Sequence, residues 1–442
     1  MACIWMQTES LPNEGGRGSS TWDSFIGDTP AVNSLELYKE DVQCLKNMKA
    51  DVYRFSIAWP RLLPKGKLSE GINQEGIDFY NNLINELIAN GIEPFVTLFH
   101  FDLPTVLQDE YNGFLGTEFV EDYKNYADLC FKTFGDRVKH WITFNEPEVF
   151  SAYGYRSGLT PPDDRAKNPY IAAHHLLLAH ANAAKVYREN YQDTQGGEIG
   201  LSLGAQWYLP LTDDSPQDKD GASRAWDFMV GWFLDPLVTG DYPFSMKAIV
   251  RDRLPEFSES EKALLKGAFD FVGINYYTSS YVKALPISPN DVPTDYQADT
   301  YVQTSSEKDG IPIGPKAEGY PEKRDDTIPI VKALQDDVRI SWIQDHLASI
   351  KEALSGGVNV NGYFAWALMD CMEMAQLYTV RFGLNYTDYL NDYARYPKKS
   401  AFWLSNFLTA SDTATAAATA DTTTASVSTN GTATATATAT AA

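Results

Sequence analysis

The run Thr-Phe-Asn-Glu-Pro at residues 143–147 puts a carboxylic acid directly after an apolar stretch, 138–144, that has the length of a strand. A carboxyl group at a strand end can protonate a leaving oxygen and later activate water, which is general acid/base catalysis. Glu146 is therefore the first candidate catalytic residue. The alternative is a glutamate that caps the next segment or forms a salt bridge, and the pentapeptide alone leaves both interpretations open.

Further polar side chains follow other apolar stretches in the same way. They are Arg54, His100, Asn145, Asn275 and, just past the last stretch, Glu373. The carboxyl ends of parallel strands meet at one face of a (βα)8 barrel, and that face is where such barrels build their active sites. The distribution of these residues therefore indicates one shared site, assembled from several strands.

Short apolar strands alternate with amphipathic helices along the chain. We expect strands at 51–59, 92–99, 138–144, 198–208, 269–277 and 358–368, and helices at 74–90, 118–134, 170–191, 222–233, 259–266, 327–354 and 400–407. Repeated units of this kind imply a parallel sheet covered by helices. An open nucleotide-binding sheet would carry a glycine-rich phosphate loop, and none is present. We therefore expect an α/β fold of the (βα)8, or TIM barrel, type over residues 1–410.

The composition excludes several classes of partner. The 442 residues include 36 Lys and Arg against 59 Asp and Glu, a formal net charge of −23. An acidic surface repels phosphate backbones and anionic lipid, which argues against nucleic-acid and membrane partners. The first eleven residues show no basic or apolar signal segment, so a cytoplasmic protein is the default expectation, while the true compartment stays open. The oligomeric state stays open.

Histidines and cysteines show no metal-binding spacing. The six His and four Cys form neither CxxC nor HExxH, so we expect no metal and no cofactor. His174, His175 and His180 are expected to be core or capping residues. Ser202 lies in a Gly-x-Ser-x-Gly string, but a nucleophile elbow needs a strand-turn-helix context, so we expect a structural serine inside a strand.

The last segment, 411–442, differs from the rest of the chain. It holds 12 Thr, 12 Ala and two Asp, with no Lys, Arg or aromatic residue. Such a segment has little apolar surface to offset the loss of chain entropy, so we expect a disordered tail. An O-glycosylated stalk is the alternative, which the lack of proline weakens.

The sequence around Glu146 resembles the plant β-glucosidases of glycoside hydrolase family 1. The resemblance extends over nearly all of residues 1–410, with matching segments at 7–9, 13–18, 38–41, 53–57, 98–100, 102–104, 143–147, 233–236, 240–243, 273–277, 363–366 and 395–400. The most specific of them are Thr-Phe-Asn-Glu-Pro at 143–147, Glu-Gly-Gly-Arg-Gly at 14–18 and Arg-Tyr-Pro-Lys-Lys-Ser at 395–400.

The resemblance implies hydrolysis of β-D-glucosides with retention of configuration, by two carboxylates about 5–5.5 Å apart. It makes Glu146 the acid/base and implies no metal or cofactor. Amide and carboxylate groups can bind neighbouring sugar hydroxyls, and a tryptophan face suits the C–H side of a pyranose. The family's sugar-binding positions match Gln7, His100, Asn145, Trp366 and Glu373.

The family's nucleophile is missing from this chain. Arg54, Asn275 and Tyr277 match positions that hold the nucleophile and keep it ionised, but the Thr-Glu-Asn-Gly run that supplies it at the end of the seventh strand does not occur. Near Tyr320 the chain passes directly from a segment that precedes this strand to one that follows it. We therefore predict an incomplete barrel, with the seventh strand deleted and the first trimmed to a remnant at 2–6.

Two carboxylates, Glu318 and Glu322, lie near this junction, but both stand among Gly, Pro and charged residues rather than at a strand end. Neither is expected to replace the nucleophile. Phe101 and Met374 stand where family members usually have tryptophan. Three hypotheses follow: an impaired β-glucosidase, a glucoside-binding pseudoenzyme, and a transcript or gene-model product that does not fold stably because a lost strand exposes two sheet edges.

Overall fold

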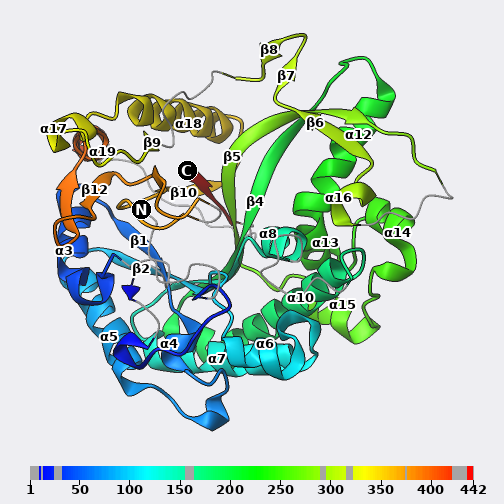
Figure 1. Cartoon of the computed structure of the whole chain (residues 1–442), viewed down its shortest axis with the longest axis horizontal. Helices are drawn as coiled ribbons and strands as arrows, with labels where there is room; N and C mark the ends of the chain where they lie inside the picture. The colour runs from blue at the N-terminus through cyan, green and yellow to red at the C-terminus, as the bar shows by residue number, and fades with distance from the viewer. Residues whose placement is uncertain are drawn as a thin grey trace.

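The fold is a curled parallel sheet inside a layer of helices, as Figure 1 shows for the computed structural model. The structure describes residues 9–10, 13–23, 32–154, 164–288, 295–314, 322–373, 376–420 and 436–441. Gln7, Glu318, Tyr320 and Met374 lie outside these residues, and so does the expected remnant of the first strand at 2–6.

The described residues form one eight-stranded sheet. Its order is β1 (Val52–Ser56), β2 (Glu93–Phe99), β3 (His140–Asn145), β4 (Glu198–Pro210), β5 (Phe271–Ala284), β14 (Thr436–Ala441) and β10 (Val360–Ala365), with β6 (Val302–Ser305) antiparallel to β5. All the other pairs are parallel. The register aligns the carboxyl ends of the strands at one edge, which is where the candidate residues were expected.

The sheet curls as a barrel does, although its two ends are not paired. Inside it, Phe95 of β2 lies 5.2 Å from Phe364 of β10 and 5.4 Å from Phe271 of β5, measured between ring centroids. β2 and β10, which lie near opposite ends of the sheet, therefore face each other across its interior. Among the described residues no hydrogen-bonded pairing joins β1 to β10, so the sheet does not close into a barrel. The prediction of a curved parallel α/β fold is confirmed, but the sheet is open where a complete (βα)8 barrel would be closed.

Helices cover the outside of the sheet (Figure 1). They follow the predicted pattern, because their apolar residues recur at helical spacing and are buried against the strands. The main ones are α3 (Ser34–Asn47), α5 (Gln74–Ala89), α7 (Glu118–Phe134), α10 (Asn168–Tyr187), α12 (Pro216–Trp226), α13 (Trp232–Thr239), α15 (Glu259–Leu265), α18 (Asp337–Ser355) and α19 (Lys399–Ala420). The expected helix at 222–233 is instead divided between α12, the segment η6 (Asp227–Gly231) and α13.

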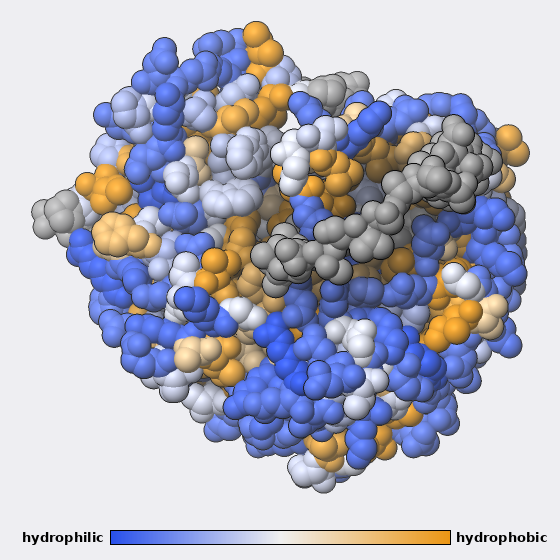
Figure 2. All heavy atoms as spheres, turned by 180° about the vertical axis from the view of Figure 1, so that it is seen from behind, coloured by the Kyte–Doolittle hydropathy of each residue, from blue (hydrophilic) through white to orange (hydrophobic). Residues whose placement is uncertain are grey.

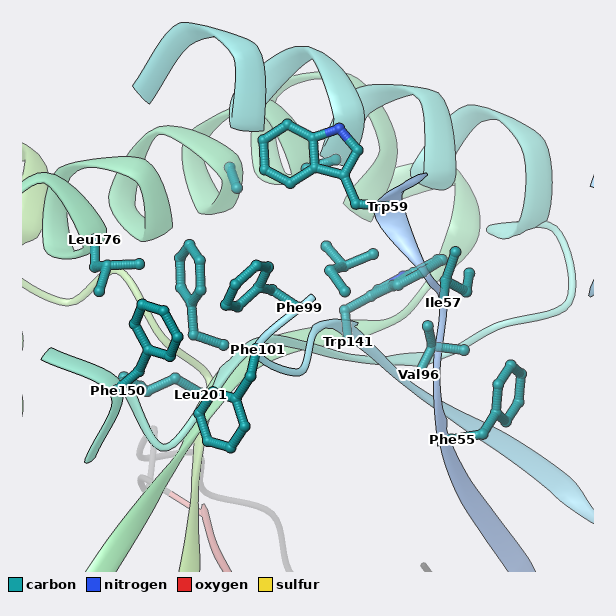
Figure 3. Close-up of a cluster of buried hydrophobic side chains, with 14 of the residues drawn as sticks. Phe55, Ile57, Trp59, Val96, Phe99, Phe101, Trp141, Phe150, Leu176 and Leu201 are labelled. Carbon is teal, nitrogen blue, oxygen red and sulfur yellow. The ribbon is translucent and has the colours of Figure 1, made fainter. Parts of the chain in front are cut away.

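A large apolar core fills the space between the strands and this helical layer (Figure 3). Trp59 and Trp141 are fully buried in it, and Trp59 stacks on Tyr126 of α7 at 4.9 Å between ring centroids. Phe99 and Phe150 belong to the same cluster, directly beneath the end of β3. This core fixes the strand ends that carry the polar site.

The tail differs from the expected disorder in two stretches. Helix α19 continues to Ala420, and Thr436–Ala441 forms β14 between β5 and β10. A threonine at every second position favours extended backbone, and the two neighbouring strands otherwise each present an unpaired edge. The tail segment therefore occupies the place in the sheet where the sequence predicted a deleted seventh strand.

The surface is largely polar. The face shown in Figure 2 is mainly hydrophilic, and its apolar residues form separate patches. In the part of the chain that the structure describes, no helix is long and apolar enough to cross a bilayer.

Candidate active site

Glu146 occupies a sharp turn between β3 and the short helix α8 (Pro147–Val149). Its backbone is left-handed, with φ 47° and ψ 54°, a conformation that non-glycine residues seldom adopt. The N–H of Glu146 donates to the carbonyl oxygen of Ser202 on β4 at 2.7 Å, and Pro147 begins the helix. The turn holds the side chain at the sheet's carboxyl edge, where it is only 7 % exposed.

A chain of hydrogen bonds fixes the Glu146 carboxylate. Nδ2 of Asn275 donates to Oε1 of Glu146 at 2.8 Å, and the Tyr277 hydroxyl donates to the same oxygen at 3.3 Å. Asn275 is itself oriented by Ser202, whose Oγ donates to Oδ1 of Asn275 at 2.7 Å. Two residues of β5 therefore donate to one oxygen of Glu146, and Ser202 of β4 orients one of them.

Asn145 links this carboxylate to the two basic residues of the site. Its Oδ1 accepts from Nδ2 of Asn275 at 3.0 Å and from Nη2 of Arg54 at 2.5 Å, and its Nδ2 donates to Nε2 of His100 at 3.1 Å. Burial, with Arg54 second, holds the pKa of His100 well below its usual range. A neutral His100 can accept the hydrogen bond from Asn145 and still donate to a ligand from its other nitrogen.

Arg54 is buried at 3 % exposure, and its Nε donates to Thr97 Oγ1 at 3.1 Å. Burial lowers its pKa to about 10, while the nearby Glu146 acts in the opposite direction, so Arg54 stays protonated at neutral pH. Among the described residues no carboxylate hydrogen-bonds to Arg54. Within the described residues, the Arg54 guanidinium is thus held by neutral oxygen atoms, those of Asn145 and Thr97.

Glu146 itself favours the protonated form. Burial raises the pKa of its carboxyl above the ordinary value, and the hydrogen bond from Asn275 and the charge of Arg54 oppose that shift. A general acid must hold its proton near neutral pH, so the direction of the shift suits proton donation to a leaving oxygen.

Trp366 and Glu373 form the other wall. Nε1 of Trp366 donates to Oε1 of Glu373 at 3.1 Å, and the Trp366 ring lies 6.1 Å from the His100 ring between centroids. Burial raises the pKa of Glu373 to about 8. An aromatic face beside a carboxyl and an imidazole can hold a pyranose through its C–H face and its hydroxyls.

The structure thus brings together almost all the residues that the sequence singled out. Glu146, Asn145, Asn275, Tyr277, Arg54 and His100 form one hydrogen-bonded network, with Trp366 and Glu373 beside it. Gln7 falls outside the described residues, but its neighbour Glu9 is anchored by Arg61 at 2.8 Å and by Tyr80 at 2.7 Å. The sequence argument did not select Thr97, and it placed Ser202 inside a strand without a link to the site; a polar side chain inside an otherwise apolar stretch was the available signal for both.

Two carboxylates, Glu318 and Glu322, lie near the junction expected at Tyr320. Glu318 lies outside the described residues. Glu322 is bound by Lys398 at 2.9 Å and by Arg339 at 3.5 Å. Glu322 therefore belongs to an ion-pair cluster, and the expectation that it does not replace the nucleophile stays a prediction.

Ser202 and the three histidines considered in the sequence analysis make contacts within the fold. Ser202 is fully buried within β4. His174 contacts the Tyr242 hydroxyl, His175 the Phe114 carbonyl and His180 the Thr143 hydroxyl. In the described ranges no group of three or more His, Cys, Asp and Glu is arranged to hold a metal ion.

A family model described as Glycosyl hydrolase family 1 matches residues 2–317 and 316–413. The chain belongs to this family. The match is divided into two stretches that meet at 316–317, close to the junction inferred near Tyr320. The Glu146 network lies in the first of these stretches, and Trp366 and Glu373 lie in the second.

Curated relatives cover most of the chain. A furostanol glycoside 26-O-β-glucosidase from Hellenia speciosa is 48 % identical over 91 % of this chain and 80 % of its own length. β-Glucosidase 11 from Oryza sativa subsp. japonica is 46 % identical over 90 % of this chain and 85 % of its own. This member of the family is thus similar to plant β-glucosidases.

Solved structures agree with the fold. A variant of the rice β-glucosidase Os3BGlu6 in a covalent complex with Glc superposes with a TM-score of 0.87, at 37 % identity over 92 % of this chain and 96 % of that one. A family 1 β-glucosidase from the fungus Humicola insolens in complex with glucose gives a TM-score of 0.86, at 38 % identity over 93 % and 97 %. The family 1 architecture is retained despite the open sheet.

Proposed function

We propose that this protein binds β-D-glucosides at the carboxyl edge of its sheet, with Glu146 as the acid/base, and that its hydrolytic turnover is severely impaired. The ligand class is supported by the relatives, which are named as glucosidases, and by two related structures that hold Glc or glucose. His100, Asn145, Trp366 and Glu373 supply hydrogen-bonding groups and an aromatic face suited to the sugar, and Gln7 is proposed to add to them.

The observation that carries the proposal is the set of hydrogen bonds made by Arg54, Asn275 and Tyr277. All three direct their polar groups to Asn145 or Glu146, and within the described residues none of them contacts a second carboxylate. Retention requires a carboxylate on the ring face opposite the acid, where it can bond to the anomeric carbon. In this proposal Glu146 retains the proton-donating role, and within the described residues no carboxylate stands where the nucleophile is needed.

Hydrolysis would follow a simple order if a nucleophile were present. Glu146 would protonate the departing oxygen while the second carboxylate formed a glycosyl ester, and Glu146 would then deprotonate the water that releases the sugar. This chain can bind the sugar and supply the proton. Without the glycosyl ester, the barrier to direct displacement by water stays high.

p-Nitrophenyl β-glucoside tests the proposal under permissive conditions, because its leaving group needs little acid assistance. We expect hydrolysis at or near the background rate and no adduct with a 2-deoxy-2-fluoroglucoside by intact mass spectrometry. Clear turnover, together with an adduct mapped to Glu318 or Glu322, would show that another carboxylate acts as the nucleophile.

A further inference from the structure

Asp102 is a buried carboxylate next to the candidate site, and it is not a member of the Glu146 network. It is 1 % exposed and lies two residues after His100, past the end of β2. Its Oδ1 accepts a hydrogen bond from the backbone N–H of His100 at 3.1 Å, and its Oδ2 accepts one from the backbone N–H of Trp59 at 3.1 Å. A carboxylate that binds two backbone groups in this way fixes the chain at both of them.

The residue between His100 and Asp102 has an unfavourable backbone conformation. Phe101 has φ 71°, in the left-handed region that a bulky residue seldom adopts. Such a residue keeps this conformation only where its surroundings hold it in place. The hydrogen bond from the His100 N–H to Asp102 spans Phe101, so it closes the turn around this residue.

The ring of Phe101 links His100 to the turn of the acid/base. It lies 5.3 Å from the His100 ring, nearly perpendicular to it, and stacks on Phe150 at 5.7 Å between centroids (Figure 3). The N–H of Phe150 donates to the carbonyl oxygen of Glu146 at 3.1 Å, and the backbone of Glu146 is itself left-handed. The two turns at the ends of β2 and β3 therefore pack on each other through Phe101 and Phe150.

Trp59 gives Asp102 a fixed support. It begins α4 (Trp59–Leu62), just after β1, and is fully buried in the apolar core. Asp102 thus joins the segment after β1 to the segment after β2. Arg54 of β1 and His100, directly after β2, are the two basic residues that contact Asn145, so this junction lies beneath both of them.

We infer that Asp102 is a positioning residue of the sugar site: its two hydrogen bonds hold the turn at Phe101 and thereby fix the His100 imidazole in the site. There His100 accepts from Asn145 and can donate to a sugar hydroxyl. The inference rests on the proposed function, because that proposal makes His100 a sugar-binding residue. Asp102 acts through the backbone and is not expected to touch the ligand.

Asp102→Asn tests the inference with a side chain of nearly the same shape. An amide presents one acceptor oxygen instead of two, and its NH2 group faces the second backbone N–H without accepting from it. Glucose affinity, measured by titration calorimetry, should fall at least about fivefold. Asp218→Asn is the matched control, because Asp218 also accepts from two backbone N–H groups, of Ala284 at 2.9 Å and of Thr212 at 3.1 Å. Asp218 lies in α12, outside the Glu146 network, so this variant should bind glucose as the unmodified chain does.

The His100 imidazole provides a readout that needs no ligand. In a chain labelled with nitrogen-15, the NMR signal of His100 Nε2 reports the hydrogen bond from Asn145, and its loss in His100→Gln assigns it. We expect this signal to shift downfield in Asp102→Asn, towards the position of an imidazole nitrogen without a hydrogen bond. It should stay in place in Asp218→Asn.

The unmodified chain gives a further readout through pH. Burial raises the pKa of Asp102 to about 7; its backbone hydrogen bonds lower it, and the charge of Glu9 adds to the rise. Tyr123 and Tyr126 of α7 also interact with Asp102, and burial holds their pKa values well above the ordinary value, so they stay neutral. The pKa of His100 lies well below its usual range. Its Nε2 signal should therefore move near pH 7, as Asp102 takes up its proton, and this movement should be absent in Asp102→Asn.

A lower glucose affinity together with a shifted Nε2 signal in Asp102→Asn, and neither change in Asp218→Asn, would support the inference. A loss of affinity without a shift of the signal, or an equal loss in Asp218→Asn, would overturn it. If Asp102→Asn does not fold, a His100 signal that does not move near pH 7 in the unmodified chain would overturn it as well. Failure of the unmodified chain to bind glucose would refute the proposed function instead, and the ligand-free signal would still show whether Asp102 positions His100.

Discussion

Asn275 donates a hydrogen bond of 2.8 Å to Oε1 of Glu146, although 129 residues separate the two in the chain. The same amide nitrogen donates to Asn145 at 3.0 Å, so one side chain of β5 orients both polar residues at the end of β3. This contact joins the acid/base to the group of residues that, by the family resemblance, once held a nucleophile.

Replacing Asn275 with alanine should raise the pKa of Glu146 further, because the hydrogen bond from Asn275 lowers it in the unmodified protein. A lost hydrogen bond to a charged group is worth about 1.5–3 kcal/mol, so the shift should be at least about one pH unit. Carboxyl carbon NMR measures it, with Glu146→Gln assigning the resonance. A pKa of Glu146 that stays the same in Asn275→Ala would contradict the network described.

Sugar binding should depend on Trp366. The chain should bind glucose or gluconolactone weakly, and Trp366→Ala should reduce the affinity at least about tenfold, since an aromatic face that stacks on the sugar and a hydrogen bond to Glu373 are both lost. Trp207→Ala is the matched control, because Trp207 is 54 % exposed and packs on Trp226. Equal affinity in both variants, measured by calorimetry, would place the sugar elsewhere.

Restoring the missing strand should restore catalysis. Inserting a family-like strand that ends in Thr-Glu-Asn-Gly between Tyr320 and Pro321 supplies the second carboxylate that a retaining mechanism needs. Measurable hydrolysis of p-nitrophenyl β-glucoside is expected. Changing the inserted glutamate to glutamine should remove it, and Glu146→Gln should abolish activity towards poor leaving groups. An inserted chain that folds, binds glucose and stays inactive would argue against a simple loss of the nucleophile.

The buried Glu373 should make stability depend on pH. Its pKa is about 8 in the folded protein and ordinarily near 4.5, so the folded state binds the proton more tightly. The resulting stabilisation is fully present below about pH 4.5 and is lost as the pH rises to 8, on the order of a few kcal/mol. Thermal unfolding between pH 5 and 8 should show a falling Tm, and Glu373→Gln should flatten the slope. A slope unchanged in Glu373→Gln would assign the effect to other groups.

The tail strand β14 should contribute to stability. Thr438 lies in β14, opposite Gly273 of β5, and the strand pairs with β10 on its other side. Thr438→Pro removes a backbone donor from an interior strand, so Tm should fall by several degrees. Thr429→Pro, seven residues before the strand, is the control. A Tm unchanged by removing 431–442 would show instead that the tail does not pair.

Much of the fold was predictable because its signals are local. The alternation of apolar strands and amphipathic helices indicated the parallel α/β architecture, and helices such as α5 and α7 lie within a residue or two of their predicted bounds. The break in helical pattern at η6 was not predicted, since a distortion within a continuous helical sequence depends on packing. The pairing of β14 was missed for the same reason: a Thr/Ala repeat forms a strand only where neighbouring edges are available.

The sequence by itself determined which residues carry chemistry. Glu146, Arg54, His100, Asn145, Asn275, Tyr277, Trp366 and Glu373 were all identified from strand ends and motifs, and the absence of Thr-Glu-Asn-Gly is a property of the sequence alone. Only the tertiary structure decided their hydrogen-bond partners and the direction in which burial shifts each pKa. Hydrogen bonds and desolvation depend on distances of a few ångströms between residues far apart in the chain, and those distances exist only after the sheet has curled.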